Sequence, residues 1–426
     1  MKLCFLADAR SPIAQNWIYY FIAAGHDVHV ISSYPCECNV LTVASLQVVP
    51  VAFSGLTRSA KRMIGAEHGG PYRLMPSPAN FRGGNLISLL NGLRHWFGPI
   101  DVYRHVKRVR RTVEELSPDL VHAMRIPFEG ILAAEALRSM RIPLLISVWG
   151  NDFTFHAQRF PLVAYMTRRA MKRADALHPD CNRDLHLARM WGFGSQKPAV
   201  VLPSIGGIQA ELFHAGPVDA TLRRRWDISE GAPIVLNPRG FRGYVRNDTF
   251  FRSIPLVLAK RPDVVFLGIA MQGNALAEQW VQRLRIRHAI RLLPAVPRNE
   301  MANLFRLADV IVSPSEHDGT PNTLLEGMAC GAFPVMGDIE SVREWVEDGV
   351  NGLFCDPAIP ESLAQAILRA LDDEDLCRQA AVHNQKLIAE RADYSKVMEK
   401  AEAFYVKLLQ WANEPPLGVG KQSAEL

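Results

Sequence analysis

Short apolar runs alternate with segments of helical period along both halves of the chain. In the first half, runs typical of buried strands occupy residues 2–7, 27–32, 120–123, 143–148 and 199–202. Segments whose apolar positions recur every three to four residues predict helices over 12–24, 103–116, 128–139, 151–173 and 183–191. Strands that alternate with helices predict a parallel sheet with helices on both faces.

The same alternation starts again after residues 203–213, whose glycines and small side chains fit a hinge. The second set of predicted strands covers 234–237, 264–267, 290–292, 310–312 and 333–336. The helices predicted between them cover 248–260, 274–285, 298–307 and 323–330. We therefore predict an α/β chain of two doubly wound domains, residues 1–205 and 206–393, then a helix at about 394–412 and a tail at 413–426.

Composition fits a soluble globular protein, with 48% hydrophobic and 21% charged residues among 426. No uninterrupted apolar run approaches the ~18 residues of a spanning helix. The chain opens directly as a strand, so we expect no signal peptide. Seven scattered cysteines do not suggest a disulfide framework, and Cys36 and Cys38 form a lone pair without the second pair of a zinc site. These features predict a cytoplasmic protein without a metal site.

Charge is distributed unevenly along the chain. Residues 1–210 carry a net charge of +10 and residues 211–426 a net charge of −5, which together give the overall +5. A basic first half can favour an anionic membrane surface or an acidic acceptor, although a solvated surface explains it equally well. No sequence motif supports recognition of nucleic acid.

The least regular part of the first half, residues 82–111, combines apolar and basic positions. Its apolar side chains fall at helical spacing at Leu86, Leu89, Leu90, Leu93 and Phe97. Its other notable side chains are Arg82, Arg94, His95, Trp96, Arg104, Lys107, Arg108, Arg110 and Arg111. An amphipathic basic helix with a tryptophan can lie in a membrane interface, which would give peripheral attachment to the inner face. The alternative is a helix that packs its apolar stripe on the sheet.

The most informative motif is residues 313–331, SPSEHDGTPNTLLEGMACG. It places Asp318 eight residues before Glu326, across the start of a predicted helix. Thr320 can cap that helix and Pro321 fits its first position, where no amide hydrogen is needed. The free N–H groups and partial positive charge of a helix start suit a phosphate. Two acids beside such a seat suggest a ligand with phosphates and hydroxyls, while a merely capped helix is the alternative.

A second candidate element is the glycine-containing loop after the predicted strand 234–237. It carries Arg239, Arg242 and Arg246. Glycine allows the backbone to approach a ligand closely, and guanidinium groups match the oxygens of a diphosphate. An ordinary basic surface loop is the alternative.

Together these motifs resemble the GT-B glycosyltransferases of family 4. The resemblance covers nearly the whole chain and is strongest over residues 295–357. In that family, two glutamates with seven residues between them bind the donor sugar and the nucleotide ribose. Asp318 and Glu326 occupy those positions here, and Gly319, Thr320, Pro321 and Asn322 lie between them. Arg239 matches the family's diphosphate-binding arginine, whereas Tyr244 stands where the family has a lysine.

In the first domain the resemblance is looser. Trp149 stands at the position of the family's histidine, so histidine chemistry cannot be carried over. Asp152 matches the family's aspartate and could orient an acceptor or sugar hydroxyl, or it could cap the helix that follows. Glu344 also matches a common family glutamate, and we expect it to be a surface acid.

The resemblance implies two Rossmann-like domains facing a cleft, with the last helix crossing back onto the first domain. The first domain would bind a glycan or lipid-linked acceptor and the second a UDP- or GDP-type sugar. Transfer of a hexose with retention, without metal or cofactor, is the implied reaction, in cell-surface polysaccharide synthesis. The implied catalytic residues are Asp318, Asp152 and Arg239. Two alternatives remain: a GT-B nucleotide-sugar epimerase, and a non-catalytic nucleotide-sugar-binding scaffold.

Overall fold

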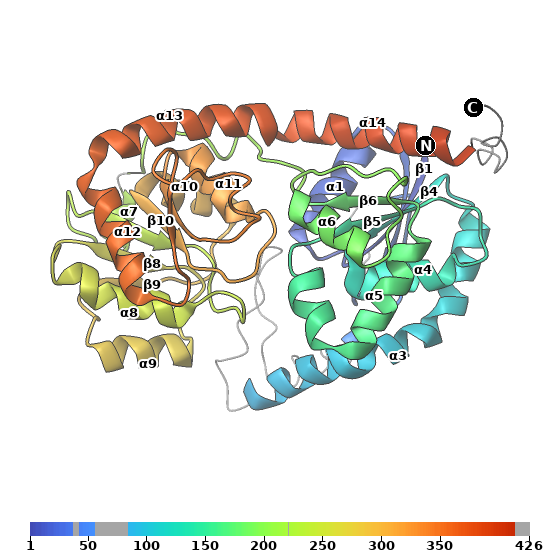
Figure 1. Cartoon of the computed structure of the whole chain (residues 1–426), viewed down its shortest axis with the longest axis horizontal. Coiled ribbons are helices and arrows are strands. Elements are labelled where there is room, and N and C mark those ends of the chain that lie inside the picture. The colour runs from blue at the N-terminus through green and yellow to red at the C-terminus, as the bar shows by residue number, and fades with distance from the viewer. Residues whose placement is uncertain (37–41, 56–83, 220, 414–426) are drawn as a thin grey trace, which may run out of the picture.

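The computed structural model describes residues 1–36, 42–55, 84–219 and 221–413. It contains two six-stranded sheets in which all pairings between strands are parallel. The first half of the chain forms one sheet and the second half forms the other, and the two lie side by side along the long axis (Figure 1). The predicted α/β class with two doubly wound parallel sheets is confirmed.

The first sheet has the order β3-β2-β1-β4-β5-β6. Its strands are β1 (Lys2–Ala7), β2 (Asp27–Ser32), β3 (Ser45–Val48), β4 (Leu120–Met124), β5 (Leu144–Val148) and β6 (Ala176–Pro179). The order reverses at the β1–β4 pair, where Leu3 lies beside Leu120. Open α/β sheets bind ligands beyond the carboxyl ends of the strands at such a reversal.

The second sheet repeats this topology in the order β12-β11-β10-β7-β8-β9. Its strands are β7 (Ile234–Asn237), β8 (Val265–Gly268), β9 (Ile290–Leu292), β10 (Val310–Ser313), β11 (Phe333–Gly337) and β12 (Leu353–Cys355). Its reversal lies at the β7–β10 pair, where Val310 lies beside Val235. The loops after β7 and β10 therefore meet at one point.

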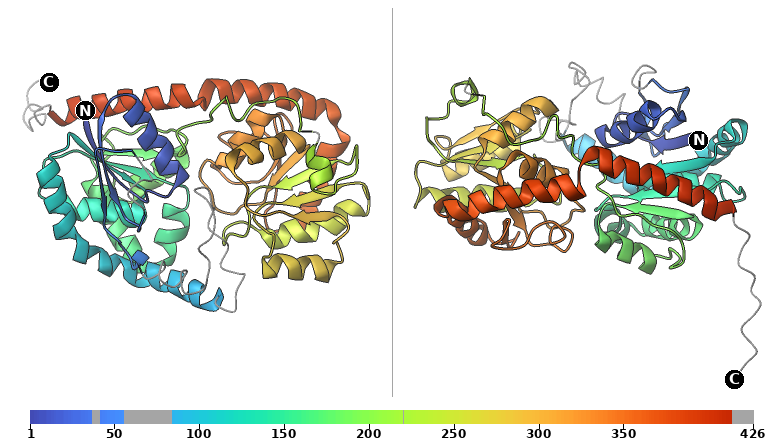
Figure 2. Two further views of the ribbon diagram at one scale, coloured as in Figure 1. Left: turned by 180° about the vertical axis from the view of Figure 1, so that it is seen from behind. Right: turned by 90° about the horizontal axis from the view of Figure 1, so that it is seen from above.

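Helices cover both faces of each sheet (Figures 1 and 2). In the first domain they are α1 (Pro12–Ala23), α3 (Gly84–Leu116), α4 (Ile131–Ala136), α5 (Pro161–Arg173) and α6 (Asn182–Met190), with π-type turns η1 (Ile126–Gly130) and η2 (Asp152–Ala157). In the second they are α7 (Thr221–Arg225), α8 (Asn247–Leu258), α9 (Ala275–Leu284), α10 (Arg298–Leu307), α11 (Asn322–Cys330), α12 (Pro360–Asp372) and α13 (Glu374–Arg391). Among the described helices, none has the length and apolar content needed to cross a membrane.

Each strand supplies both faces of its sheet because successive side chains point to opposite sides. In β1, Cys4 and Leu6 belong to one buried cluster, while Leu3 and Phe5 belong to another on the opposite face. The second sheet repeats this division, with Leu236 of β7 in one cluster and Val235 in another. Two apolar layers around each sheet hold its strand ends in fixed positions.

The last helix, α14 (Tyr394–Asn413), returns to the first domain. It lies end to end with α13 along one edge of the molecule, so the red helices in Figure 2 span both domains. The chain crosses between the domains twice, once near Ile208 and once near Tyr394. The two crossing segments are joined by a hydrogen bond from the Tyr394 amide to the Ile208 carbonyl, at 3.0 Å. On the first domain, the Tyr405 hydroxyl bonds to His122 Nδ1 at 2.5 Å, and Tyr20 bonds to Glu402 at 3.0 Å.

Several predicted elements differ from the structure. Residues 199–202 form no strand and contribute only an isolated bridge from Ala199 to Leu177, which belongs to the unpredicted strand β6. The helix predicted over 151–173 is divided into η2 and α5, because Pro161 begins a new helix. Some predicted features lie outside the described residues. They are the tail beyond Asn413, Arg82, Cys38 and the side chains of the leucines from 86 to 93.

Candidate active site

The candidate site lies beyond the carboxyl ends of β7 and β10, at the reversal of the second sheet. Arg239 follows β7 and Asp318 follows β10. Arg239 Nη2 donates to Asp318 Oδ2 at 2.5 Å, and both side chains are nearly buried. Burial alone would lower the pKa of Arg239, but the carboxylate of Asp318 and other nearby groups outweigh it and raise that pKa. The structure thus joins the two predicted residues in one ion pair.

The start of α11 is built differently from the prediction. Pro321 is the residue that precedes the helix, and Asn322 is its first residue. Thr320 does not cap the helix: its hydroxyl donates to the carbonyl of Asp180 at 2.5 Å and accepts from Trp345 Nε1 at 3.1 Å. The prediction of a Thr320 cap was wrong because the sequence could not show this partner from the other domain. In the described chain, the Asn322 amide donates no hydrogen bond, as expected for a first helical turn.

Glu326 lies one turn further along α11 and is 7% exposed. Burial raises its pKa to about 7, an effect that the neighbouring Arg298 only partly offsets. Arg298 Nη2 donates to Glu326 Oε1 at a long 3.4 Å. The guanidinium of Arg298 also lies over the ring of Phe213, at 5.1 Å. Glu326 is therefore a buried acid with one weak cationic partner.

The other two arginines of the loop after β7 are placed differently from each other. Arg242 is exposed and donates from Nη1 to the Tyr244 hydroxyl at 3.2 Å. Tyr244 also lies beside Arg239, whose Nη2 is 3.5 Å from the same hydroxyl. Arg246 is engaged by two acids, Asp248 at 2.8 Å and Glu316 at 2.6 Å. The tyrosine at the family's lysine position therefore links two of the three arginines.

In the first domain, Asp152 lies just beyond β5 and is fully buried. It accepts hydrogen bonds from Arg125 Nε at 3.0 Å and from the amides of Ile126 and Trp149 at 3.2 and 3.1 Å. Burial raises its pKa, and Arg125 opposes that shift. These partners tie the ends of β4 and β5 together, which is a structural task for Asp152 alongside the predicted contact with a hydroxyl.

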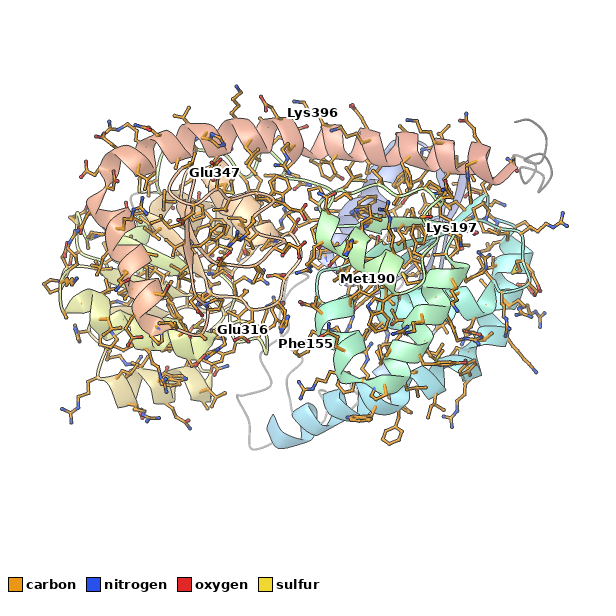
Figure 3. The ribbon with its side chains drawn as sticks, in the orientation of Figure 1. Phe155, Met190, Lys197, Glu316, Glu347 and Lys396 are labelled. Atoms are coloured by element: carbon orange, nitrogen blue, oxygen red, sulfur yellow. The ribbon has the colours of Figure 1, made fainter. Side chains whose placement is uncertain are left out.

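The two domains meet directly at the loop 318–322. Gly150 of the first domain lies so close to Gly319 that a side-chain carbon on either residue would collide, on Gly319 with the carboxylate of Asp180. Figure 3 shows Phe155 and Glu316 at this boundary. The Phe155 ring lies 6.4 Å from Tyr244 and 6.2 Å from His317. The predicted loop 318–322 is therefore in contact with the carboxyl end of the first sheet.

A second set of contacts between the domains centres on Glu344. Its carboxylate accepts from the amide and side chain of Asn182 at 2.7 to 3.0 Å and from the amide of Arg183 at 3.3 Å. An acid at this position satisfies the free amides at the start of α6. Arg183 also donates to Ser341 of the second domain at 3.3 Å. Glu344 was expected to be a surface acid, and it is partly exposed, but the structure adds partners that lie 161 and 162 residues away in the chain.

Within the described ranges, one side-chain group has the spacing for a metal ion: Asp180, Cys181 and Asp184, with ligand atoms within 4.8 Å of one another. Burial and the nearby acids raise the pKa of Cys181 far above that of an ordinary thiol. Asp184 is also paired with Arg183 at 2.7 Å. One of the three candidate ligands thus already has a cationic partner.

Two family models match the chain. "Glycosyl transferase 4-like domain" matches residues 11–204, and "Glycosyl transferases group 1" matches residues 218–386. Together they cover most of the chain. The chain belongs to the family 4, or group 1, glycosyltransferases. The family predicted from the motifs is confirmed.

The curated relatives are distant, and each aligns with only part of the chain. The D-inositol 3-phosphate glycosyltransferase of Thermobispora bispora is 28% identical over 179 residues, 40% of this chain and 42% of the relative. The GDP-mannose-dependent alpha-mannosyltransferase of Corynebacterium glutamicum is 25% identical over 281 residues, 64% of each chain. The chain thus aligns with less than two thirds of the length of these relatives.

Solved structures agree with the fold over nearly all of the chain. Sucrose-phosphate synthase from Thermosynechococcus elongatus superposes with a TM-score of 0.73 at 14% identity, covering 96% of this chain and all of that one. HepE of Anabaena, in complex with UDP-glucose, superposes with a TM-score of 0.66 at 17% identity, covering 95% of this chain and all of that one. The GT-B fold predicted from the resemblance is confirmed.

Proposed function

We propose that the chain transfers a hexose from a nucleoside-diphosphate sugar to a hydroxyl group of an acceptor. The observation that carries this proposal is the gathering of Arg239, Asp318 and Glu326 around the start of α11, beside the loop that contacts the other domain. Membership of the group 1 glycosyltransferases supports it.

In this proposal each donor group has its own partner. Arg239 and the free amides at the start of α11 would hold the diphosphate, since both favour negative charge. Glu326 would accept hydrogen bonds from the ribose, and Asp318 from hydroxyls of the sugar. Asp318 and Arg239 already pair at 2.5 Å, so a donor would exchange one ion pair for two charge-assisted contacts. Arg242, exposed beside Tyr244, is the second candidate for the diphosphate.

The base of the donor is proposed as uracil or guanine. The Anabaena structure contains UDP-glucose, which favours a UDP-type donor, and the name of the Corynebacterium relative specifies GDP-mannose. We further propose a glycan or lipid-linked acceptor at the first domain, as part of cell-surface polysaccharide synthesis. In this proposal Asp152, just beyond β5, would contact an acceptor or sugar hydroxyl once its own partners give way.

The family resemblance also implies retention of anomeric configuration without a metal or other cofactor, and we propose both. The task of the protein is then electrostatic. Arg239 and the α11 dipole stabilise the leaving diphosphate, and Asp318 keeps the sugar oriented while positive charge develops on it. We assign no protein nucleophile.

A panel of nucleoside-diphosphate sugars tests the proposal. Purified protein is incubated with each donor, and thermal shift and release of nucleoside diphosphate are measured together. We expect one donor to raise the melting temperature and to be slowly hydrolysed or transferred. Stabilisation without any turnover, even with candidate acceptors, would support a binding scaffold instead, and conversion of the sugar without release of nucleotide would support an epimerase. The absence of a shift with every donor and every free nucleoside diphosphate would refute the donor site.

A further inference from the structure

One face of α3 carries large apolar side chains that are not covered by the domain. Trp96, Phe97, Ile100 and Tyr103 are each between 47% and 54% exposed. These four side chains lie within eight consecutive residues, so they form one patch and not a scatter of single residues. Exposed apolar side chains that occur singly are ordinary on a protein surface, whereas a contiguous patch marks a contact with something else.

Basic side chains continue the same face over the next two turns, and the exposed Glu114 and Glu115 follow on it in the last turn. Arg104, Lys107, Arg108 and Arg111 are all exposed. At 3.6 residues per turn, these four and the four apolar residues fall within an arc of about 140° around the helix axis. The opposite side of α3 carries the buried Val102, Val109 and Val113, which belong to the core of the first domain. The apolar-then-basic face therefore points away from the domain.

The orientation of α3 is fixed by tight packing. Gly98 lies between Trp96 and Ile100 in sequence, and a side chain there would collide with Ala52 and Phe128. Trp96 is half-exposed and contacts the domain with its ring perpendicular to Phe160 at 5.6 Å. The helix cannot turn its aromatic face inward without losing this close approach.

Two of the four basic residues, Lys107 and Arg108, have no evident role within the described part of the chain. Cations stabilise the last turn of a helix through its dipole, but Lys107 and Arg108 lie two turns or more before the end at Leu116. Arg104 and Arg111 have acidic partners, Asp101 at 3.5 Å and Glu115 at 2.8 Å. Lys107 and Arg108, by contrast, form no ion pair with any residue in the described part of the chain.

We propose that this face of α3 binds the surface of an anionic lipid bilayer. Aromatic and aliphatic side chains of moderate exposure would enter the headgroup region, while the basic residues contact the lipid phosphates. A bilayer surface matches both halves of the face, because the acyl-chain boundary takes the apolar side chains and the anionic headgroups take the cationic ones. The neighbouring helix α5 extends the patch with Tyr165, which is 56% exposed.

The place of α3 in the molecule suits such a contact. It runs along the edge of the first domain opposite to α14, and its first half extends toward the second domain (Figure 1). A membrane on this side would lie along the first domain, where the acceptor is proposed to bind. The donor residues sit on the other domain and need no membrane, so donor binding in solution is independent of this proposal.

Co-sedimentation with vesicles tests the proposal on the full chain. The probes are vesicles of phosphatidylcholine alone and vesicles that contain phosphatidylglycerol in equal part. We expect binding to the anionic vesicles alone, weakened by salt. The double variant Lys107→Gln and Arg108→Gln should partition onto the vesicles on the order of 30-fold less, at about 1 kcal/mol for each basic residue removed. The double variant Trp96→Ser and Phe97→Ser should reduce partitioning on the order of 10-fold or more.

The matched control uses two exposed lysines on the opposite edge. Lys396, labelled in Figure 3, and Lys400 lie on α14. The pair Lys396→Gln and Lys400→Gln removes the same charge and should leave partitioning unchanged. Equal losses for both pairs would show that net charge alone attracts the vesicles, which overturns the proposal. So would the absence of binding to anionic vesicles, or a dimer in solution that the Trp96→Ser and Phe97→Ser variant dissociates.

Discussion

Two acidic residues of the candidate site differ in their surroundings. Asp318 has a strong cationic partner in Arg239, whereas Glu326 has only the long contact to Arg298. The first is poised to hold sugar hydroxyls next to a charged diphosphate, and the second to accept hydrogen bonds from a ribose. Their different partners lead to different predictions.

Replacing Glu326→Ala should weaken donor binding by about 10- to 100-fold, because a hydrogen bond to a charged group contributes roughly 1.5–3 kcal/mol. The pKa of about 7 adds a pH dependence. Below that pKa the acid is neutral and accepts hydrogen bonds poorly, so donor affinity should rise as pH increases from 6 to 8. Calorimetric titration of the nucleoside diphosphate across this range is the measurement. An unchanged affinity for Glu326→Ala, or a slope that persists in Glu326→Gln, would contradict the ribose role.

The Asp318→Asn variant should lower turnover more than nucleotide binding. It weakens the proposed contact with the sugar, while the contacts with the nucleotide remain. We expect kcat to fall by about 10- to 100-fold, with the Kd for nucleoside diphosphate changed by less than about 3-fold. The matched control is Glu316→Gln, an acid two residues earlier that pairs with Arg246. Equal losses in kcat and in nucleotide affinity would reject the contact with the sugar.

At the scale of elements, strands of the second domain could be predicted well from the sequence. Ile234–Asn237 and Ile290–Leu292 match their predicted bounds, because short apolar runs between helices leave few other arrangements. Strand β6 escaped prediction since its sequence, Ala-Leu-His-Pro, contains two residues atypical of strands. His178 is tolerated there because Ser147 and the carbonyl of Leu202 satisfy its ring nitrogens, at 2.9 and 3.0 Å.

The candidate site shows the same limit. The local motif was enough to choose Asp318, Glu326 and Arg239, because their spacing lies within two loops and one helix. Asp180 and Glu344 were not chosen as site residues, since their importance comes from contacts across the domain boundary. Such contacts depend on the relative placement of two domains, which no local period or spacing encodes.

The contact between Glu344 and the start of α6 predicts a role in domain closure. Replacing Glu344→Ala removes a charged acceptor for the Asn182 and Arg183 amides, so the closed arrangement should become less populated. We expect kcat to fall by about 10-fold while the Kd of the nucleoside diphosphate, whose proposed partners all belong to the second domain, stays within about 2-fold. The control is Glu347→Ala, an exposed acid on the same segment, labelled in Figure 3.

Solution scattering provides an independent check of that prediction. The Glu344→Ala variant should have a larger radius of gyration than the wild type, and Glu347→Ala should not. A variant with unchanged shape and unchanged kcat would show that the Glu344 contact contributes nothing to closure.

At the scale of the whole molecule, the return of α14 ties the end of the chain to the first sheet through a buried polar chain. Tyr405 bonds to His122, His122 to Ser147 at 2.7 Å, and Ser147 to His178 at 2.9 Å. Burial lowers the pKa of His178 to about 4 and the pKa of His122 well below its usual value. Both rings are therefore neutral in the folded protein near neutral pH.

This network predicts a loss of stability in acid. Below about pH 6.5 the histidines of the unfolded chain become protonated, whereas the buried rings of the folded protein stay neutral. The free energy of unfolding therefore falls as pH drops toward 4. The contribution of His178 is on the order of 3 kcal/mol, from a shift of 6.5 to about 4. Melting temperatures at pH 7 and pH 5 should therefore differ more for the wild type than for His178→Gln. The exposed His383→Gln should behave as the wild type, and an identical pH response in all three would refute the prediction.

The central claim is that the start of α11 and the loop after β7 hold a nucleoside-diphosphate sugar. The most direct test is a crystal structure with the nucleoside diphosphate that stabilises the protein most. We expect its phosphates within hydrogen-bonding distance of Arg239 and the amide of Asn322, and its ribose on Glu326. A nucleotide bound elsewhere, with the pair of Arg239 and Asp318 intact, would contradict this donor site.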